Sequence, residues 1–266
     1  MRSRLPPEEE NGRIDPRKAA GGEEMEGKKE RLDRILVLNH IGSRKEAGKL
    51  IRSGQVTVNG QMVRRPEEKA DPDRDRICVK GEALPGGRYL YLMMNKPAGV
   101  LSAARDPRAQ TVVDLLPGRW QRPGIFPAGR LDKDTTGFLV LTDDGEFAHR
   151  MLSPKSHVDK VYLAQLDRPV DGEDQRQFAQ GMDLGDFVSL PAKMEPAAPD
   201  GCTARVTLHE GKFHQVKRMF EKCGKQVVAL KRIQIGIVNL DENLAAGEAR
   251  ELTKEERDQL FLHDFC

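Results

Sequence analysis

The apolar run Phe138-Leu139-Val140-Leu141 is the feature that most constrains how this chain can fold. A strand with one face in water alternates apolar and polar side chains, whereas all four side chains of this run are apolar. The run ends in Thr142-Asp143-Asp144-Gly145, which is typical of a turn. These residues therefore predict a buried strand that leads into a turn.

Further segments with strand or helix patterns surround this run. Strand patterns cover residues 89–95, 161–166, 203–208 and 227–235, and helix patterns cover residues 146–152 and 212–222. Thr253 and Glu256 form a capping box, which predicts a last helix that ends at Leu260. Strands mixed with few helices, without regular alternation, favour an α+β fold with a largely antiparallel sheet.

A smaller unit precedes this domain. Apolar spacing predicts a helix over residues 32–41, and Ser43 with Glu46 predicts a capping box that begins a second helix. Asn59-Gly60 between two short strand patterns is the strongest short hairpin signal, and residues 77–79 predict a further strand. The small unit therefore contains two helices followed by a hairpin sheet.

Local composition sets the predicted boundaries. Residues 1–28 are rich in Glu, Gly, Pro and Arg and nearly free of large apolar side chains, so we expect a disordered tail. Pro85-Gly86-Gly87 indicates a linker. The predicted division is therefore a tail at 1–28, a small domain at 29–84 and a larger domain at 85–266.

Charge and cysteine usage narrow the class of protein. The net charge is only +2, but residues 28–80 hold fourteen Lys and Arg against eight Asp and Glu, a local net charge of +6. Such a block is either a nucleic-acid footprint or an ordinary solvated surface. No run of about 18 apolar residues predicts a membrane span. The four cysteines form no CxxC pair, so we expect a cytoplasmic protein without a bound metal.

The densest set of polar residues is Gly129-Arg130-Leu131-Asp132-Lys133-Asp134. Three interpretations are open. The aspartates can simply cap turns, or they can form a DxD pair of a magnesium-dependent phosphatase, although that site needs an apolar strand directly before its first Asp and a loop precedes Asp132. In the third interpretation, Asp132 is a catalytic carboxylate whose charge neighbouring cations stabilise.

The third interpretation is the one that matches a family. The string FPAGRLDKDTTGFLVLTDDGEFAHRMLSP closely resembles the active-site motif of the RsuA/RluB group of ribosomal-RNA pseudouridine synthases. The resemblance implies that Asp132 is the catalytic residue. Lys160-Val161-Tyr162 resembles the family's K-x-Y element, which implies that Tyr162 stacks on the target base. The segment from Gly211 to Met219 resembles the third motif, which implies that Lys217 pairs with Asp132.

The resemblance extends to substrate contacts and to the small domain. Residues at the substrate are implied to be Arg130, Thr136, His214, Gln215, Arg218, Leu230 and Arg232. The run RLDRILVLNHIGSRKEAGKLIRSGQVTVNGQMV resembles the alpha-L RNA-binding domain of ribosomal small-subunit protein four. That resemblance implies RNA contacts at Arg31, Arg44, Lys45, Lys49 and Arg52, and cations on one outer helix face can meet phosphates.

The family resemblance also sets expectations for fold and chemistry. It implies an antiparallel sheet of two ferredoxin-like halves, no cofactor, and a monomer that acts on ribosomal RNA or a ribosomal subunit precursor. Isomerising uridine exchanges a C–N for a C–C glycosidic bond without gain or loss of atoms. The motif sequences favour small-subunit 16S rRNA as the target. A large-subunit rRNA enzyme and a non-catalytic rRNA-binding assembly factor are the alternatives.

Overall fold

The computed structural model describes residues 29–39, 41–84, 87–153, 156 and 158–262. The predicted tail at residues 1–28 and the first two residues of the predicted linker lie outside this range. Among the described residues, no helix is both long and apolar enough to cross a bilayer.

The N-terminal part has the predicted helices and hairpin. Helix α1 (Leu32–Leu38) and helix α2 (Arg44–Arg52) pack beside a sheet of order β3-β2-β5-β6. The strands of this sheet are β2 (Val56–Val58), β3 (Gln61–Val63), β5 (Ile77–Val79) and β6 (Glu82–Ala83). A separate pair joins β1 (Glu30–Arg31) to β4 (Lys69–Ala70). The predicted capping box is confirmed: the Ser43 hydroxyl accepts from the Glu46 N–H, and the Glu46 carboxylate accepts from the Ser43 N–H.

Helix α1 is shorter than the predicted 32–41. The Asn39 side chain donates to the Ile35 carbonyl at 2.9 Å, and the chain leaves the helical conformation at Asn39. A polar side chain that bonds to the last-turn carbonyls ends a helix in this way.

A nine-stranded sheet forms the rest of the molecule, with the order β11-β12-β10-β13-β9-β7-β15 and with β14 and β8 paired to β13 and β9. The strands are β7 (Tyr91–Lys96), β8 (Phe126–Pro127), β9 (Thr136–Thr142), β10 (Lys160–Leu166), β11 (Lys193–Pro196), β12 (Thr203–Leu208), β13 (Val227–Ile235), β14 (Val238–Asn239) and β15 (Ala249–Glu251). The helices are α3 (Gly145–Leu152), α4 (Gly172–Gln180), α5 (Gln215–Lys222) and α6 (Lys254–Gln259), with a 3-10 turn at Gly118–Trp120.

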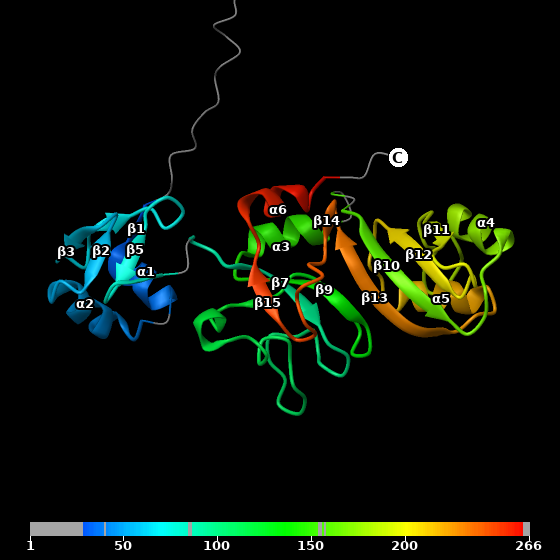
Figure 1. Cartoon of the computed structure of the whole chain (residues 1–266), viewed down its shortest axis with the longest axis horizontal. Helices are drawn as coiled ribbons and strands as arrows, with labels where there is room; N and C mark the ends of the chain where they lie inside the picture. The colour runs from blue at the N-terminus through cyan, green and yellow to red at the C-terminus, as the bar shows by residue number, and fades with distance from the viewer. Residues whose placement is uncertain (1–28, 40, 85–86, 154–155, 157, 263–266) are drawn as a thin grey trace, which may run out of the picture.

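The sheet has two halves that meet at β9 and β13 (Figure 1). The chain segment β10-α4-β11-β12-α5-β13 is a βαββαβ unit whose strands lie in the order β13-β10-β12-β11, all antiparallel, which is a ferredoxin-like half. The other half combines β7 and β9 with β15 from the end of the chain. The predicted, mainly antiparallel α+β fold is confirmed.

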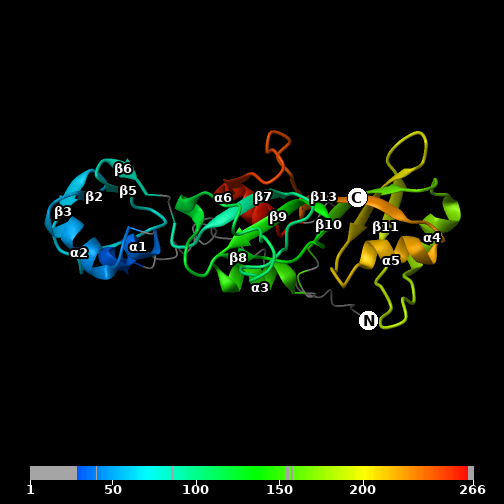
Figure 2. The same cartoon turned by 90° about the horizontal axis from the view of Figure 1, so that it is seen from below.

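The two faces of the sheet carry different cores. On one face, Phe138 and Val140 of β9 pack with residues of α3 and with Leu252 and Leu260, which flank α6. On the opposite face, Leu139 and Leu141 pack with Trp120, and this core continues across β10 and β12 to α4 and α5. Figure 2 shows α4 and α5 beside β10, β11 and β13. The four residues of the apolar run are 0% exposed, so the predicted buried strand is confirmed.

The halves join through the one parallel strand pairing of the described sheet, between β9 and β13. Gly137 makes this close approach possible: its φ is +98°, and a Cβ placed there would lie 2.2 Å from the Arg232 carbonyl oxygen. Any side chain would therefore separate the two strands, which explains why a glycine stands between the motif loop and the buried run.

Two predictions about elements need correction. The helix predicted at 212–222 begins only at Gln215, because His214 has a left-handed backbone (φ +52°) that a continuous α-helix cannot include. Helix α4 and strand β11 were not predicted. Helix α4 starts with a capping box at Asp171 and Asp174, a pattern of the kind that located the last helix.

Candidate active site

Asp132 lies in the loop between β8 and β9, at the junction of the two halves. The last residue of β7 and the segment after it fix this loop by hydrogen bonds. The Lys96 ammonium donates to the carbonyls of Lys133 (3.2 Å) and Thr135 (2.9 Å), and to that of Pro97 (3.0 Å). The Ser102 hydroxyl donates to the Leu131 carbonyl at 2.8 Å and accepts from the Leu131 N–H at 3.1 Å. The loop that carries Asp132 is therefore anchored on both sides of that residue.

A lysine from the other half reaches the loop. Lys217 of α5 places its Nζ 3.2 Å from Asp132 Oδ2 and 2.7 Å from Asp134 Oδ1. The His214 Nε2 lies 3.4 Å from Asp132 Oδ1. The Asp132 and Lys217 side chains are 26% and 23% exposed, whereas that of Asp134 is 74% exposed. Lys217 thus bridges one partly buried and one exposed carboxylate.

The electrostatics of this cluster favour charged side chains. Partial burial acts to lower the pKa of Lys217, but hydrogen bonds to Asp134 and Asp132 outweigh it and raise the pKa above its usual value. The hydrogen bond from Lys217 lowers the pKa of Asp134. Burial lowers the pKa of Lys96 to about 8, although Asp134 and Asp132 act in the opposite direction. At neutral pH, Lys217 is therefore a fixed positive charge beside Asp132.

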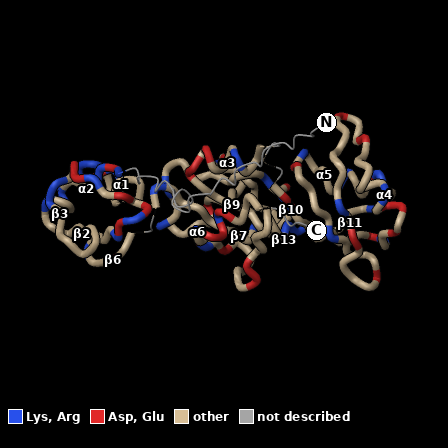
Figure 3. The backbone as a smooth tube through the Cα atoms, turned by 90° about the horizontal axis from the view of Figure 1, so that it is seen from above, with Lys and Arg blue, Asp and Glu red and all other residues tan. Residues whose placement is uncertain are grey.

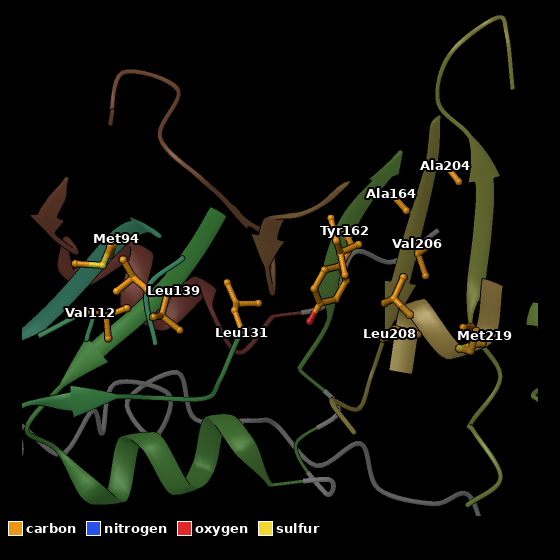
Figure 4. Packing of buried hydrophobic residues seen from close by; sticks show 14 of the residues in the cluster. Met94, Val112, Leu131, Leu139, Tyr162, Ala164, Ala204, Val206, Leu208 and Met219 are labelled. Atoms are coloured by element: carbon orange, nitrogen blue, oxygen red, sulfur yellow. The ribbon is translucent and has the colours of Figure 1, made fainter. Parts of the chain in front are cut away.

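Tyr162 on β10 and Leu230 on β13 line a cavity of about 50 Å³ beside Asp132. In Figure 4, Leu131 and Tyr162 lie between the core residues of the two halves. Tyr162 is 7% exposed, and its hydroxyl lies 3.4 Å from Arg232 Nη1. Arg232 also donates through Nε to the Phe138 carbonyl at 2.7 Å, while its buried Nη2 has no partner among the described residues. The Tyr162 ring is thus held at its hydroxyl end and faces the pocket.

The other residues expected at the substrate are placed differently from one another. Arg130 and Gln215 line the same cavity, but Gln215 is buried and donates to Glu210 at 2.7 Å. Thr136 donates to the Leu230 carbonyl at 3.4 Å and helps to join β9 to β13. Arg218 points to the Asp186 carboxylate and the Leu184 carbonyl, and it does not line the cavity.

Sequence reasoning missed three residues of this site. Asp134 is the closer carboxylate partner of Lys217, and Lys96 and Ser102 hold the loop that carries Asp132. Lys96 carried a signal, because it belongs to the Asn95-Lys96-Pro97 stretch that resembles the family. Ser102 carried none, because its partner is 29 residues away in the sequence.

A larger cavity of about 450 Å³ lies between α3 and α6. Three acidic residues line it: Asp144, Glu146 and Asp258. Asp144 caps α3 and accepts from the Tyr91 hydroxyl at 2.6 Å, so that carboxylate has a structural function. The smaller cavity has a carboxylate with a lysine 3.2 Å away, Asp132 with Lys217, so chemistry at an ionised carboxylate fits that cavity better. No group of three or more His, Cys, Asp or Glu in the described residues is arranged to hold a metal ion.

The cations expected to contact RNA lie on the N-terminal part. Arg44, Lys45, Lys49 and Arg52, the α2 basic cluster, are exposed on one helix (Figure 3). Arg31 lies nearby and pairs with Asp33 at 2.8 Å. The N-terminal part contacts the larger domain where the buried Arg122 Nε donates to the Leu38 carbonyl at 3.0 Å, and where Arg88 pairs with Glu30 at 3.5 Å.

Comparison with known proteins gives consistent matches. Residues 90–222 match the RNA pseudouridylate synthase family, and residues 30–75 match the S4 domain family. An uncharacterised RNA pseudouridine synthase of Bacillus subtilis is 47% identical over 229 residues, which cover 85% of this chain and 96% of the relative.

A ribosomal small subunit pseudouridine synthase A of Escherichia coli is 42% identical over 233 residues, which cover 85% of this chain and 97% of the relative. A crystal structure of a pseudouridylate synthase superimposes with a TM-score of 0.61 and 37% identity, and covers 86% of this chain and 99% of the solved chain.

Proposed function

The chain belongs to the RNA pseudouridylate synthase family, whose members isomerise uridine in RNA, and from that premise we propose that Asp132 is its catalytic carboxylate and that small-subunit ribosomal RNA is its substrate. One observation carries the assignment of Asp132. The Asp132 carboxylate lies beside a cavity that is lined by the Tyr162 ring, and the Lys217 ammonium is 3.2 Å from it. Asp134 also contacts that lysine but lies 74% exposed outside the cavity.

The chemistry requires an ionised carboxylate at the ribose. In the reaction the bond between C1′ and N1 of uridine breaks, the uracil turns, and a bond between C1′ and C5 forms while the C5 proton moves to N1. Asp132 acts at the sugar as nucleophile or base, and either action needs its charged form. The Lys217 ammonium stabilises that charge in a partly buried site.

Tyr162 and Leu230 supply the surface that holds the detached uracil. A flat ring offers stacking area at low conformational cost, and the Arg232 contact keeps the ring from rotating away. The cavity of about 50 Å³ has space for only one or two water molecules. The target uridine must therefore leave its RNA stack, and side chains at the cavity rim must move to admit it.

We assign separate tasks to the two parts of the chain. The part at 29–84 contributes the α2 basic cluster, which suits phosphate contacts, and the part at 85–266 contributes the chemistry. The name of the Escherichia coli relative specifies the ribosomal small subunit, and this supports action on 16S rRNA or its precursor particle in the cytoplasm. A single copy of the chain carries all the residues assigned here, in keeping with a monomer.

The test is pseudouridine mapping with a matched pair of variants. We expect Asp132→Asn to abolish pseudouridine formation in small-subunit rRNA while RNA affinity stays within about two-fold. Asp186→Asn is the control, because it removes an exposed, ion-paired carboxylate outside the cavity. Residual turnover by Asp132→Asn would contradict the assignment of that residue. Pseudouridine that appears only in large-subunit rRNA would contradict the substrate, and none from the wild type in any RNA would indicate a non-catalytic binding protein.

A further inference from the structure

Phe213 is an exposed aromatic residue beside the catalytic cluster. Its side chain is 72% exposed, and it is the one aromatic member of the exposed large apolar residues among those described. Transferring a ring of this size out of water gains roughly 1.5–3 kcal/mol, and Phe213 gains little of this from the protein itself. Isolated exposed apolar residues are common, so exposure alone assigns no function.

The geometry around Phe213 is more specific than its exposure. The ring stacks on the His214 ring, with centroids 3.8 Å apart and an interplanar angle of 17°. The same His214 places its Nε2 3.4 Å from Asp132 Oδ1. An unbroken series of contacts therefore connects the exposed phenyl ring, through the imidazole, to the catalytic carboxylate.

The position relative to the cavity indicates which part of the substrate the ring meets. Lys212 and His214, on either side of Phe213 in the chain, both line the cavity, but Phe213 does not. The ring therefore lies at the rim, outside the space assigned to the target uracil. Arg130, on the opposite strand-connecting loop, also lines the cavity, is exposed, and has no ion-pair partner within the described residues. A flat apolar ring and a free cation at one rim match the base and the phosphate of a nucleotide.

We propose that Phe213 is a base-stacking residue, which receives the nucleobase next to the target uridine when that uridine enters the cavity. The inference rests on the proposed function. A base flanking a flipped nucleotide loses one stacking neighbour, and an aromatic side chain can replace it. His214 supports the ring from behind and keeps the outer face free for the base. Stacking accepts any base, so Phe213 adds affinity and placement with little sequence selectivity.

The first experiment separates an aromatic ring from apolar bulk. Phe213→Tyr and Phe213→Trp keep a ring, whereas Phe213→Leu keeps apolar bulk without one. The substrate is protein-free small-subunit rRNA from cells that lack this gene. We expect the two aromatic variants to remain within about two-fold of wild type. Phe213→Leu should weaken RNA affinity about ten-fold, which is about 1.4 kcal/mol, while the single-turnover rate at saturating RNA stays within about three-fold.

The second experiment detects stacking directly. Phe213→Trp places an exposed indole at the rim, while the native Trp120 is buried and 5% exposed. Saturating rRNA, or an oligouridylate of about eight nucleotides, should quench the emission of this indole. Val228→Trp is the control, because Val228 is 68% exposed but, unlike Phe213, has no chain neighbour that lines the cavity. Its emission should change much less.

The outcomes distinguish this inference from the proposed function. Equal affinity and rate for Phe213→Leu and wild type, or equal quenching of the two tryptophans, would overturn the stacking assignment. A defect of Phe213→Leu on assembled particles but not on protein-free rRNA would show that the ring contacts a ribosomal protein, which also overturns it. If the wild type forms no pseudouridine, the proposed function fails, and the quenching of Phe213→Trp by RNA still decides whether Phe213 stacks on bases.

Discussion

Replacing Gly137 with alanine tests the junction that brings the two halves of the site together. Gly137 has a φ of +98°, and a Cβ at this position would lie 2.2 Å from the Arg232 carbonyl oxygen and 2.9 Å from Lys231 Cγ. Ordinary carbon contacts begin near 3.5 Å, so β9 and β13 would have to separate by about 1 Å. Asp132 lies just before β9, and Leu230 and Arg232 lie on β13, so the same junction sets the distance between these residues.

The expected destabilisation follows from two costs. A left-handed backbone costs a residue with a Cβ about 1–2 kcal/mol. Forcing extra volume into a packed site costs about 1–3 kcal/mol more. The free energy of unfolding should therefore fall by about 2–5 kcal/mol. For a chain of this size this corresponds to a fall in Tm of about 5–15 °C.

The assay is thermal unfolding by circular dichroism, combined with single-turnover pseudouridine formation well below the Tm of the variant. Gly172→Ala is the matched control, because Gly172 begins α4 and a Cβ there would meet nothing within 4 Å. The control should be neutral or slightly stabilising. The folded Gly137→Ala protein should also turn over more slowly, because its pocket walls have moved apart. A Tm within about 2 °C of wild type together with an unchanged rate would refute the close-approach argument.

Four further predictions concern charged side chains and metal dependence. Lys217→Met should lower the saturated rate by at least about 100-fold with little effect on RNA affinity, and Lys222→Met at the end of the same helix should not. Replacing all four residues of the α2 basic cluster with alanine should make the slope of log affinity against log salt shallower by up to about three or four units, with the saturated rate preserved; an unchanged slope would show that this cluster is not an RNA anchor. Activity should fall as pH rises through about 8, because Lys96 then loses one of three donated hydrogens. The unfolded state retains that proton to higher pH, so the titration of Lys96 raises the free energy of unfolding between pH 8 and about 10.5. Lys160→Met removes the other lysine of pKa about 8 and should keep the alkaline loss of activity. Excess EDTA should leave activity unchanged once magnesium needed by the RNA is controlled for, because no group of three or more His, Cys, Asp or Glu among the described residues is arranged to hold a metal ion; a loss that only a specific transition metal restores would contradict this.

Local sequence signals predicted the elements whose causes lie within a few residues. The capping boxes at Ser43 and Thr253 are present, because each depends on one side chain that reaches three residues along the chain. The hairpin at Asn59-Gly60 forms, with Asn59 and Gly60 both at positive φ. The apolar run of β9, residues 138–141, is 0% exposed, because removing four large apolar side chains from water is favourable.

Motif resemblance predicted which residues gather at the site, but not how they are bonded. It paired Lys217 with Asp132, and that contact is present at 3.2 Å. It did not predict that Asp134 lies nearer to Lys217 or that Arg218 turns to Asp186. A motif names residue types in order, and the choice between two neighbouring carboxylates depends on where a helix from the other half of the sheet begins.

The sequence by itself determined the local elements, the buried central strand, and through its motifs the family and the candidate carboxylate. Only the tertiary structure decided the arrangement of the candidate site: the parallel junction at Gly137, the hydrogen bonds from Lys96 and Ser102 to the loop that carries Asp132, and the stacking of Phe213 on His214. Lys217 and Asp134 are 83 residues apart, and Thr136 and Leu230 are 94 apart. Contacts over such separations depend on how the sheet is ordered and on which backbones can approach, and no spacing along the chain records that.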